Sequence, residues 1–360
     1  MTESQYLTAI YAFNYFGPAR VNLLLSYFKK ARKIWLSNPS ELAEIGLSKE
    51  RVLEFEEFRK KFDIEDYFRR LTKLKIGVIT ILDVAYPVNL KGLEGAPSVL
   101  YFKGHLKVAD INSVAIVGSR KMSSYGREVA QKFSAELASF GVTIISGLAK
   151  GIDTAAHRGA LSVGGRTVAV LGQGLDSVYP VENTKLAEEI IKSGGALLSE
   201  YPLGYPALPA NFATRNRIVS GLSAAVVVIE GAEKSGTLLT ASHAAEQGKS
   251  VFAVPGQITS PLSAAPHFLL KNGAKIATSA RDILEELDLQ VKVDRETIEK
   301  ILPSSKDEAK LIEILAVEPL HLDEIVRISG GKTSEISARL TIMEMKGMIR
   351  NLGGGMYKKT

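Results

Sequence analysis

The sequence contains no cysteine among its 360 residues. This absence excludes disulfide bonds, zinc–thiolate sites, iron–sulfur clusters and cysteine nucleophiles together, and it fits a reducing compartment. Histidine is also scarce. The five histidines are scattered along the chain and form no H-E-x-x-H motif, which is the pattern of many zinc sites. The sequence has no G-x-S-x-G nucleophile motif either. We therefore expect no metal ion, no cofactor and no covalent catalysis.

Long hydrophobic runs are absent as well. No apolar stretch approaches the ~18 residues that a membrane-spanning helix needs. The first twenty residues lack the basic start and apolar block of a secretory signal. Apolar residues make up 46% of the chain and charged residues 23%, the usual mix for a protein that folds around a core. These features predict a cytoplasmic protein with no membrane contact.

Charge of one sign is only slightly in excess. Forty-five Lys and Arg against 39 Asp and Glu give a net charge of +6. Residues 1–75 hold 14 of the basic and 10 of the acidic residues, so most of the excess lies there. A basic balance favours a polyanionic partner. The rest of the chain is nearly neutral, so an anion site there has to come from the local placement of a few residues.

The composition divides the chain into four segments. Residues 1–72 are aromatic and basic with helical periodicity, and we expect a small helical domain. Residues 76–288 alternate short β-branched runs with alanine-rich helical stretches. A charged segment over 289–304 is typical of a linker, and residues 305–360 read as three helices and a hairpin, which predicts a winged helix.

Six short apolar runs in the central segment indicate buried strands. The runs are continuous rather than alternating, as expected when both faces of a sheet are covered. Helical stretches lie between them, at 125–140, 152–163, 183–193, 214–222 and 237–247. This succession predicts right-handed crossovers and an α/β fold with a Rossmann-like, doubly wound parallel sheet. The runs are 114–117, 142–146, 167–171, 196–199, 225–230 and 250–254, and 76–81 and 99–102 extend the sheet or pack beside it.

Glycines follow five of these strands directly. In an open α/β sheet such strand ends face the ligand crevice, where glycine lets the backbone approach a ligand closely. The next helix offers its free N–H groups to an anion. Five such turns on one edge favour a phosphate-bearing ligand over purely structural tight turns. The glycines are Gly118, Gly147, Gly172, Gly231 and Gly256.

Two of these turns come close to nucleotide-binding motifs without completing them. The turn from Gly172 has Ser177 where a dinucleotide fingerprint needs its third glycine. The turn from Gly231 to Thr237 has the spacing of a P-loop but lacks the lysine after Gly236. We expect phosphate-cradling turns there, without nucleotide hydrolysis.

Basic side chains stand in three of the turns. Arg120 offers a forked guanidinium that matches a phosphate, unless it is an ordinary surface arginine. The turn from Ser146 to Lys150 resembles an anion-binding nest. Asp153 and His157 lie four residues apart on the helix that follows, where a capping carboxylate and a packed histidine explain them more simply than a catalytic couple.

A third basic group opens the helical stretch near residue 214. Asn216 lies between Arg215 and Arg217, and Phe212 comes shortly before them. Such a group combines phosphate neutralisation with a surface for base stacking, although a helix start with a buried phenylalanine has the same pattern.

The flanking segments leave two interpretations open. The turn at 45–47 resembles a helix-hairpin-helix, in which amides and basic side chains hold phosphates, and a protein-contact module competes with that reading. The third helix of the C-terminal segment has few basic residues, which favours protein contact or a vestigial DNA contact over groove binding. The N-terminal segment also has a group of basic residues between the turns near residues 17 and 38. They are Lys29, Lys30, Arg32 and Lys33.

Taken in order, eight motifs resemble the DNA-processing protein A family, DprA, also called Smf. They run from about residue 86 to 275, and both flanks resemble the sterile-alpha-motif-like and winged-helix modules of its longer members. The motifs are YP…L (86–90), VAIVGSR (114–120), SGLAKGID…AH (146–157), AVLGQGLD…YP (169–180), LLSEYP (197–202), RNRIVSGLS (215–223), SGTLLTA (235–241) and VPG (254–256).

The resemblance implies a binding protein rather than an enzyme. Members of this family bind and protect single-stranded DNA, load the RecA recombinase onto it during natural transformation, and act as homodimers through the Rossmann-like core. By the same resemblance, Arg120 and Lys150 contact phosphate, Phe212 stacks on a base, and Arg215 and Arg217 line the same pocket together with Asn216. Backbone and hydroxyl donors are expected from Gly118, Ser119, Ser146, Gly147, Ser235, Gly236 and Thr237.

Two other functions fit parts of the sequence. The core also resembles phosphoribohydrolases that act on nucleoside monophosphates, but Thr240 stands three residues after Thr237 where their glutamate is expected. A protein-interaction scaffold whose turns hold only structural anions is the third hypothesis.

Overall fold

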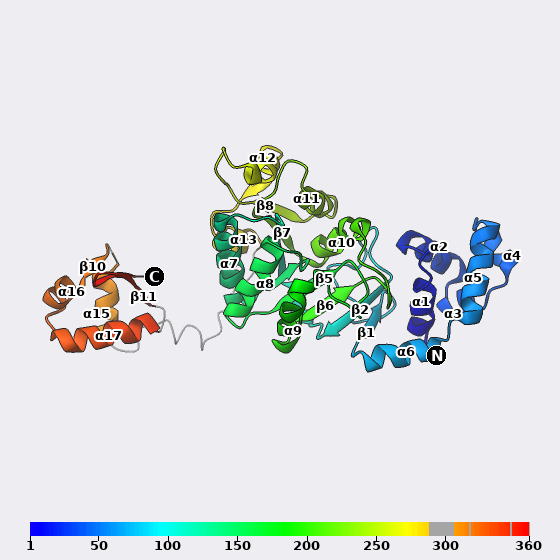
Figure 1. Cartoon of the computed structure of the whole chain (residues 1–360), viewed down its shortest axis with the longest axis horizontal. Helices are drawn as coiled ribbons and strands as arrows, with labels where there is room; N and C mark the ends of the chain where they lie inside the picture. The colour runs from blue at the N-terminus through cyan, green and yellow to red at the C-terminus, as the bar shows by residue number, and fades with distance from the viewer. Residues whose placement is uncertain (288–305, 317, 346–347, 360) are drawn as a thin grey trace. The chain divides into compact units, whose positions relative to one another are not determined.

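The chain forms two units, Met1–Gln290 and Val291–Thr360, and each is described by itself. The linker predicted at 289–304 lies outside the residues that the structure describes. None of the described helices has the length and apolarity to span a lipid bilayer. The computed structural model (Figure 1) describes residues 1–287, 306–316, 318–345 and 348–359.

The first seventy-five residues are helical, as predicted. Several of these helices begin at a capping side chain: Thr2 and Asn38 each form a capping box, and Ser48 and Asp63 accept a hydrogen bond from the first turn. The helices, blue in Figure 1, are α1 (Glu3–Tyr11), α2 (Pro18–Phe28), α3 (Ala31–Leu36), α4 (Pro39–Glu44), α5 (Lys49–Lys61) and α6 (Ile64–Lys73).

A nine-stranded sheet is the centre of the first unit. The strand order is β1-β2-β6-β5-β4-β3-β7-β8-β9. In this order, all neighbouring strands from β6 through β5, β4, β3, β7 and β8 to β9 are parallel. At the other end of the sheet, β1 pairs antiparallel with β2, and β2 pairs antiparallel with β6. The strands are β1 (Gly77–Thr80), β2 (Val99–Gly104), β3 (Ser113–Val117), β4 (Thr143–Ser146), β5 (Thr167–Leu171), β6 (Ala196–Ser199), β7 (Ala225–Val228), β8 (Ser250–Ala253) and β9 (Lys275–Ile276).

Helices cover both faces of this sheet. Val114 and Ile116 of β3 belong to a hydrophobic cluster with α7 and α8. Ala115 and Val117 point to the opposite face and belong to a cluster with α10 and α11. The doubly wound parallel sheet is therefore confirmed. The helices are α7 (Ser124–Ser139), α8 (Ile152–Ser162), α9 (Thr184–Lys192), α10 (Pro209–Leu222), α11 (Thr237–Glu246), α12 (Ala264–Lys271) and α13 (Ala280–Glu286), with 3₁₀ turns at Val108–Ile111, Val181–Asn183 and Pro261–Ser263.

The direction of winding reverses at β3. The chain moves from β3 through β4 and β5 to β6, and then returns through α10 to place β7 on the other side of β3. Crossovers leave such a reversal point open at the carboxyl ends of the strands, which is where ligands bind in this class of sheet.

Helix α10 begins earlier than the sequence pattern predicts. The expected stretch starts at residue 214, whereas the helix begins at Pro209. Proline is favoured in the first helical turn because its fixed φ suits the helix and its missing N–H has no partner there. Phe212 consequently lies within the helix, on the same side as residues one turn later.

The N-terminal helices share a core with the sheet. Ile10 of α1 and Leu71 of α6 belong to one hydrophobic cluster with Val99 and Tyr101 of β2. The helical segment is therefore docked against the antiparallel end of the sheet by apolar packing, the main favourable term in folding.

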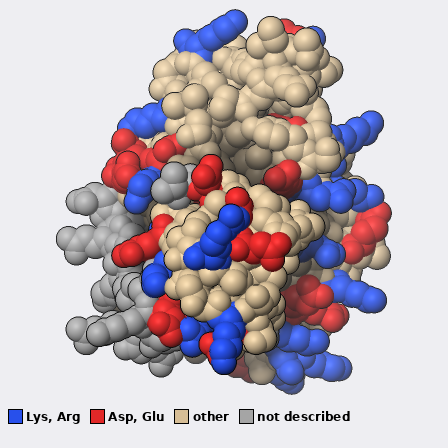
Figure 2. All heavy atoms as spheres, turned by 90° about the vertical axis from the view of Figure 1, so that its left-hand side faces the viewer, with Lys and Arg blue, Asp and Glu red and all other residues tan. Residues whose placement is uncertain are grey.

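The second unit has the predicted winged-helix form. Three helices pack around a cluster that includes Leu311, Ile325 and Leu340. A three-stranded sheet has the order β10-β12-β11. On the face shown in Figure 2, basic and acidic side chains are interspersed rather than gathered by sign. The elements are α15 (Lys306–Ile314), β10 (Leu320–His321), α16 (Leu322–Ser329), α17 (Thr333–Met345), β11 (Ile349–Gly353) and β12 (Met356–Lys359).

Candidate nucleic-acid interface

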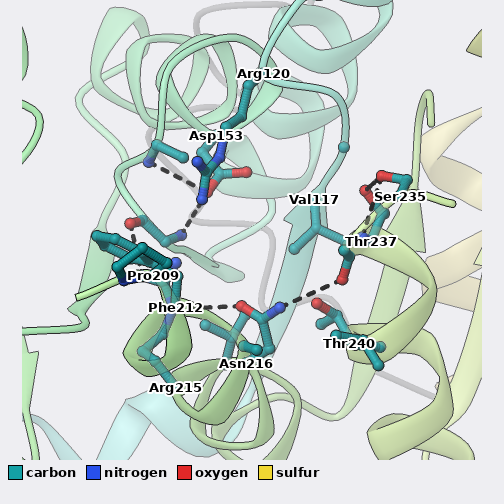
Figure 3. A pocket seen from close by; sticks show the side chains of 17 residues that line it. Val117, Arg120, Asp153, Pro209, Phe212, Arg215, Asn216, Ser235, Thr237 and Thr240 are labelled. Carbon is teal, nitrogen blue, oxygen red and sulfur yellow. Dashed lines mark hydrogen bonds between the residues drawn. The ribbon is translucent and has the colours of Figure 1, made fainter. Parts of the chain in front are cut away.

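A cavity of about 310 Å³ opens at the carboxyl ends of β3 and β4, at the point where the winding reverses. Its wall combines the turns after these strands with one face of α10 and the start of α11 (Figure 3). Among the residues that line it, Asp153 is the only acidic one. The lining residues with a polar or aromatic side chain are Arg120, Asp153, Phe212, Arg215, Asn216, Ser235, Thr237 and Thr240.

Arg120 and Phe212 form the rim of the cavity. The guanidinium carbon of Arg120 lies 5.4 Å from the centre of the Phe212 ring, within the range of a cation–π contact. The ring of Tyr179 lies 5.4 Å from that of Phe212 on a tilt of 32°. Arg120 and Tyr179 are exposed and Phe212 is half-buried, so this rim offers one charge and two aromatic rings to a ligand.

The turn that carries Arg120 is held by Glu230, at the end of the neighbouring strand. The Ser119 amide donates to the Glu230 carbonyl at 2.8 Å. The Glu230 carboxylate accepts from the amide of Ser123 at 2.9 Å and from its hydroxyl at 2.5 Å. The backbone at Arg120 is therefore fixed, and only its side chain is free to meet a ligand.

Gly118 allows the same turn to pack closely. A Cβ atom at this position would lie 2.6 Å from the Ile152 side chain and 3.0 Å from the Glu230 carbonyl oxygen. No larger residue fits without moving the strand end, so Gly118 serves the shape of the cavity as well as lining it.

Arg215 is buried beneath the cavity, with 4% of its surface exposed. Its Nη1 donates to the carbonyl of Gly147 at 2.7 Å and to that of Val170. Burial lowers the pKa of Arg215 to about 10, while the nearby Asp153 raises it and Arg120 lowers it. Arg215 therefore gives the cavity floor a positive charge, with its Nη1 donor already used within the protein.

The predicted anion nest after β4 is filled by a carboxylate of the protein itself. Asp153 Oδ2 accepts hydrogen bonds from the amides of Gly147 at 3.1 Å and Ala149 at 3.3 Å. Burial raises the pKa of Asp153, and Arg215 and these hydrogen bonds oppose that rise. Gly147 also has no room for a side chain, because a Cβ would lie 2.4 Å from Arg215 Nη2. Its contribution is shape rather than a free donor.

Ser146 does not reach the cavity. The side chain is fully buried, and its hydroxyl donates to the Ile116 carbonyl at 2.7 Å. Strand β4 continues to this residue, so its side chain faces the core of the sheet. The expected hydroxyl donor at Ser146 is therefore unavailable to a ligand.

Arg217 also lies away from the cavity. Successive helical residues are about 100° apart, so the side chain two positions after Arg215 points to the other side of α10. There it pairs with Glu200, which also accepts a hydrogen bond from Tyr11 at 3.0 Å. The structure thus joins Arg215 and Asn216 to the site and directs Arg217 to the N-terminal helices.

Lys150 stands beyond the aromatic rim. It lines a smaller cavity of about 60 Å³ that shares Arg120 and Phe212 with the main one. Its side chain is 58% exposed and its Nζ lies 2.5 Å from Glu182 Oε1. A pair this exposed contributes little to stability, so a phosphate can replace the carboxylate at small cost.

The start of α11 forms the opposite wall. The hydroxyls of Ser235 and Thr237 lie 2.7 Å apart, and the Asn216 side-chain amide donates to the Gly236 carbonyl at 3.3 Å. This ten-residue helix directs its positive N-terminal end toward the cavity. Ser119 differs from these residues, because it does not line the cavity and its hydroxyl accepts the Lys121 amide at 3.1 Å.

Sequence reasoning missed several lining residues. Pro209, Ala213 and Thr240 line the cavity, and Tyr179 stands at its rim. Helical spacing could have identified three of them. Once the start of α10 is placed at Pro209, Ala213 follows at i, i+4 on the same face, and Thr240 follows Thr237 at i, i+3.

A doubly wound sheet with a polar crevice at its reversal point, followed by a winged helix, defines a class of Rossmann-like proteins whose ligands bind at that point of the sheet. The family model for DNA recombination-mediator protein A matches residues 77–288, and that for the DprA winged helix domain matches residues 299–355. The chain therefore belongs to the DNA recombination-mediator protein A family, as its motifs predicted.

Curated relatives and solved structures agree with this assignment. The chain is 38% identical to protein Smf of Escherichia coli over 323 residues, which cover 88% of this chain and 86% of that protein. It is 42% identical to DprA of Streptococcus pneumoniae over 227 residues, which cover 63% and 80% of the two chains.

Two solved structures are similar. The structure of S. pneumoniae DprA has a TM-score of 0.63 and 36% identity and covers 79% of this chain and 93% of that one. A structure that concerns the single-stranded DNA binding mode of DprA from Helicobacter pylori has a TM-score of 0.54 and 28% identity, with 60% and 97% coverage.

Proposed function

We propose that this protein binds single-stranded DNA and acts in the cytoplasm as a recombination mediator during natural transformation. The observation that carries the proposal is the Arg120–Phe212 pair at the rim of a polar cavity. The family membership supports it, and the H. pylori relative was solved for its single-stranded DNA binding mode.

Each part of the rim suits one part of a nucleotide. The Arg120 guanidinium matches a phosphate in shape and charge. The ring of Phe212 offers a face on which a base stacks, and it is available only to a base that is not paired. The cavity behind it has room for further nucleotide groups and presents hydroxyl and amide groups from Asn216, Ser235 and Thr237.

Two kinds of residue therefore make the proposed site. Arg120, Lys150, Phe212 and Asn216 present side chains to the strand, and α11 presents its positive end through Ser235, Gly236 and Thr237. Shape and floor come from Gly118, Gly147 and Arg215.

The test is the binding of a fluorescently labelled oligo-dT, followed by anisotropy at moderate salt, with unlabelled single strand or duplex as competitor. We expect displacement by the single strand at much lower concentration than by the duplex. Equal displacement by both, or no binding, would refute the proposal.

We further propose that the protein delivers the strand to RecA. The experiment measures RecA filament formation on oligo-dT coated with a single-strand binding protein, with and without this protein. A faster start of filament growth is the expected result, and an unchanged start would contradict it.

A homodimer through the Rossmann-like core is part of the same proposal. Strand β9 is an edge strand, and Ile276 on it and Phe268 of α12 are exposed apolar residues. Figure 2 shows few charged side chains at the upper end of the molecule, where α12 lies in Figure 1. Light scattering should give twice the mass of one chain, and Phe268→Glu should halve it. A wild-type mass of one chain would refute the dimer.

We propose binding without catalysis at this site. Asp153, the acidic residue of the lining, already accepts two backbone amides and lies near Arg215. A base with its lone pairs so occupied is poorly placed to activate water. Release of adenine from AMP, measured by chromatography, would instead support the phosphoribohydrolase alternative.

A further inference from the structure

The turn between α2 and α3 concentrates basic side chains on the N-terminal helices. Phe28, Ala31 and Ile34 are buried at a spacing of three residues and anchor the turn in the core. The residues between them consequently point outward. These exposed residues are Lys29, Lys30, Arg32 and Lys33, here called the basic turn.

Among the described residues, no carboxylate forms an ion pair with a side chain of the basic turn. Lys150 and Arg217, in contrast, each pair with a carboxylate. Glu3 approaches the turn, but its carboxylate accepts the backbone amide of Arg32 at 3.2 Å. Four cations within five positions, without an ion-pair partner in the described part of the chain, attract a polyanion.

Local stability does not explain Lys29, Lys30 and Arg32. Lys29 has a φ of 63°, a left-handed conformation that glycine adopts far more readily. Lys30 is the N-cap of α3 and Arg32 lies in its first turn, where the helix end is positive and carboxylates are preferred. Local rules broken without a gain in stability are typical of functional surfaces.

An exposed aromatic ring lies beside the basic turn. Tyr27 is 53% exposed, and its hydroxyl donates to Glu44 at 3.4 Å. A ring next to cations offers stacking together with phosphate contacts, the combination that binds single strands.

We propose that the basic turn and Tyr27 form a second contact for single-stranded DNA, which holds a stretch of the strand outside the Arg120–Phe212 cavity. The inference rests on the proposed function and extends the strand length that one protein covers. A strand long enough to reach both places should bind more tightly than one that fills the cavity alone.

The chain offers a matched pair of variants. Lys29 and Lys75 are both exposed lysines with a left-handed φ, at 63° and 55°; Lys29 directly follows α2, and Lys75 comes two residues after the end of α6. Replacing either by glycine removes one charge and relieves the backbone, so both variants should melt at or above the wild-type temperature. Only Lys29→Gly should weaken the binding of a thirty-nucleotide oligo-dT, by about fivefold at 0.1 M salt if one phosphate contact is lost.

A six-nucleotide oligo-dT separates this inference from the proposed function. Lys29→Gly should leave its affinity unchanged, whereas Arg120→Ala should weaken the binding of both lengths. If Lys29→Gly and Lys75→Gly weaken the long oligomer equally, or neither does, the second contact is refuted while the Arg120 result still stands.

Trp35 supplies an independent readout, because it is the single tryptophan and lies in α3. Its ring packs on Phe55 at 5.9 Å and on Phe58 at 6.2 Å, close to the basic turn in sequence and outside the cavity. The long oligomer should change its fluorescence, and Lys29→Gly should reduce that change. Silent Trp35 fluorescence at saturation would contradict the inference.

Discussion

Arg120 lies over the ring of Phe212, with its guanidinium carbon 5.4 Å from the ring centre. One residue follows β3 and the other lies in the first turns of α10, so the fold alone brings them together. The contact places a guanidinium that can bind phosphate beside an aromatic ring that can stack on a base, the two features that the proposed binding of a nucleotide chain needs. Substitutions of Arg120 and of Phe212 should therefore differ in how they change the affinity for single-stranded DNA and its dependence on salt.

Phe212→Leu removes the ring without removing charge. We expect the affinity for oligo-dT to fall by about 1–3 kcal/mol of binding free energy, the usual value of one stacked base. The dependence of affinity on salt should stay the same, and Phe212→Tyr should bind nearly as tightly as the wild type. Anisotropy titrations at several salt concentrations check both statements, and a changed salt slope for Phe212→Leu would contradict them.

Arg215→Met should destabilise the fold rather than selectively weaken binding. The change leaves the buried Asp153 carboxylate without its neighbouring cation and the Gly147 and Val170 carbonyls without a donor. Leaving a buried carboxylate without its compensating cation in this way costs about 3–5 kcal/mol. Urea unfolding measures the loss, with the exposed Arg158→Met on α8 as a control that should stay close to wild type. Wild-type stability in Arg215→Met would overturn the structural role.

His157 makes stability depend on pH. Burial, together with the nearby Arg215, lowers its pKa to about 3. Its Nδ1 lies 2.7 Å from the Thr167 hydroxyl, which itself donates to the Ile144 carbonyl, so the neutral ring carries its hydrogen on Nδ1. The unfolded chain takes up a proton below about pH 6.5 whereas the folded protein does not, so stability from this group is complete above that pH and is lost as the pH falls toward 3.

His157→Asn isolates this contribution. Between about pH 7 and about pH 5, the wild type should lose about 2 kcal/mol more unfolding free energy than the variant. Urea unfolding at both pH values gives the comparison. Equal losses in the two proteins would show that His157 becomes protonated within the folded state.

Tyr11→Phe tests how the N-terminal helices are joined to α10. The buried Glu200 carboxylate accepts from the Tyr11 hydroxyl at 3.0 Å and pairs with Arg217. Loss of one donor to a buried carboxylate costs about 1–3 kcal/mol of unfolding free energy. Tyr27→Phe is the matched control, because its bond to Glu44 lies at the surface at 3.4 Å and should contribute little. Equal effects of the two changes would mean that Glu200 finds another donor.

The sequence pattern was sufficient for the architecture of the core. Continuous apolar runs marked β3 to β8, and the glycine after β3 marked a turn at the ligand edge. Parallel strands buried on both faces leave few alternative arrangements, which is why residue type alone was informative. The start of α10 was missed because Pro209 reads equally well as part of a loop and as a first helical residue.

Individual site residues were harder to predict than the edge on which they lie. Arg215 and Arg217 are alike in the sequence, yet one lies beneath the cavity and the other pairs with Glu200 on the far side of α10. Asp153 occupies the Gly147 and Ala149 amides that the sequence offered to a phosphate. Such outcomes depend on which other groups of the protein contact these residues in the folded chain. Tertiary packing decides those contacts, and the spacing of residues in the sequence does not.

The most direct test of the account is the salt dependence of oligo-dT binding by the wild type and by Arg120→Ala. Each phosphate held by a cation contributes about −0.7 to the slope of log affinity against log salt concentration. We expect Arg120→Ala to bind every single-stranded sequence more weakly and to flatten the slope by about that amount. The exposed Arg281→Ala on α13 should match the wild type. Identical affinity and slope in Arg120→Ala and wild type would remove Arg120 from the interface and contradict the account.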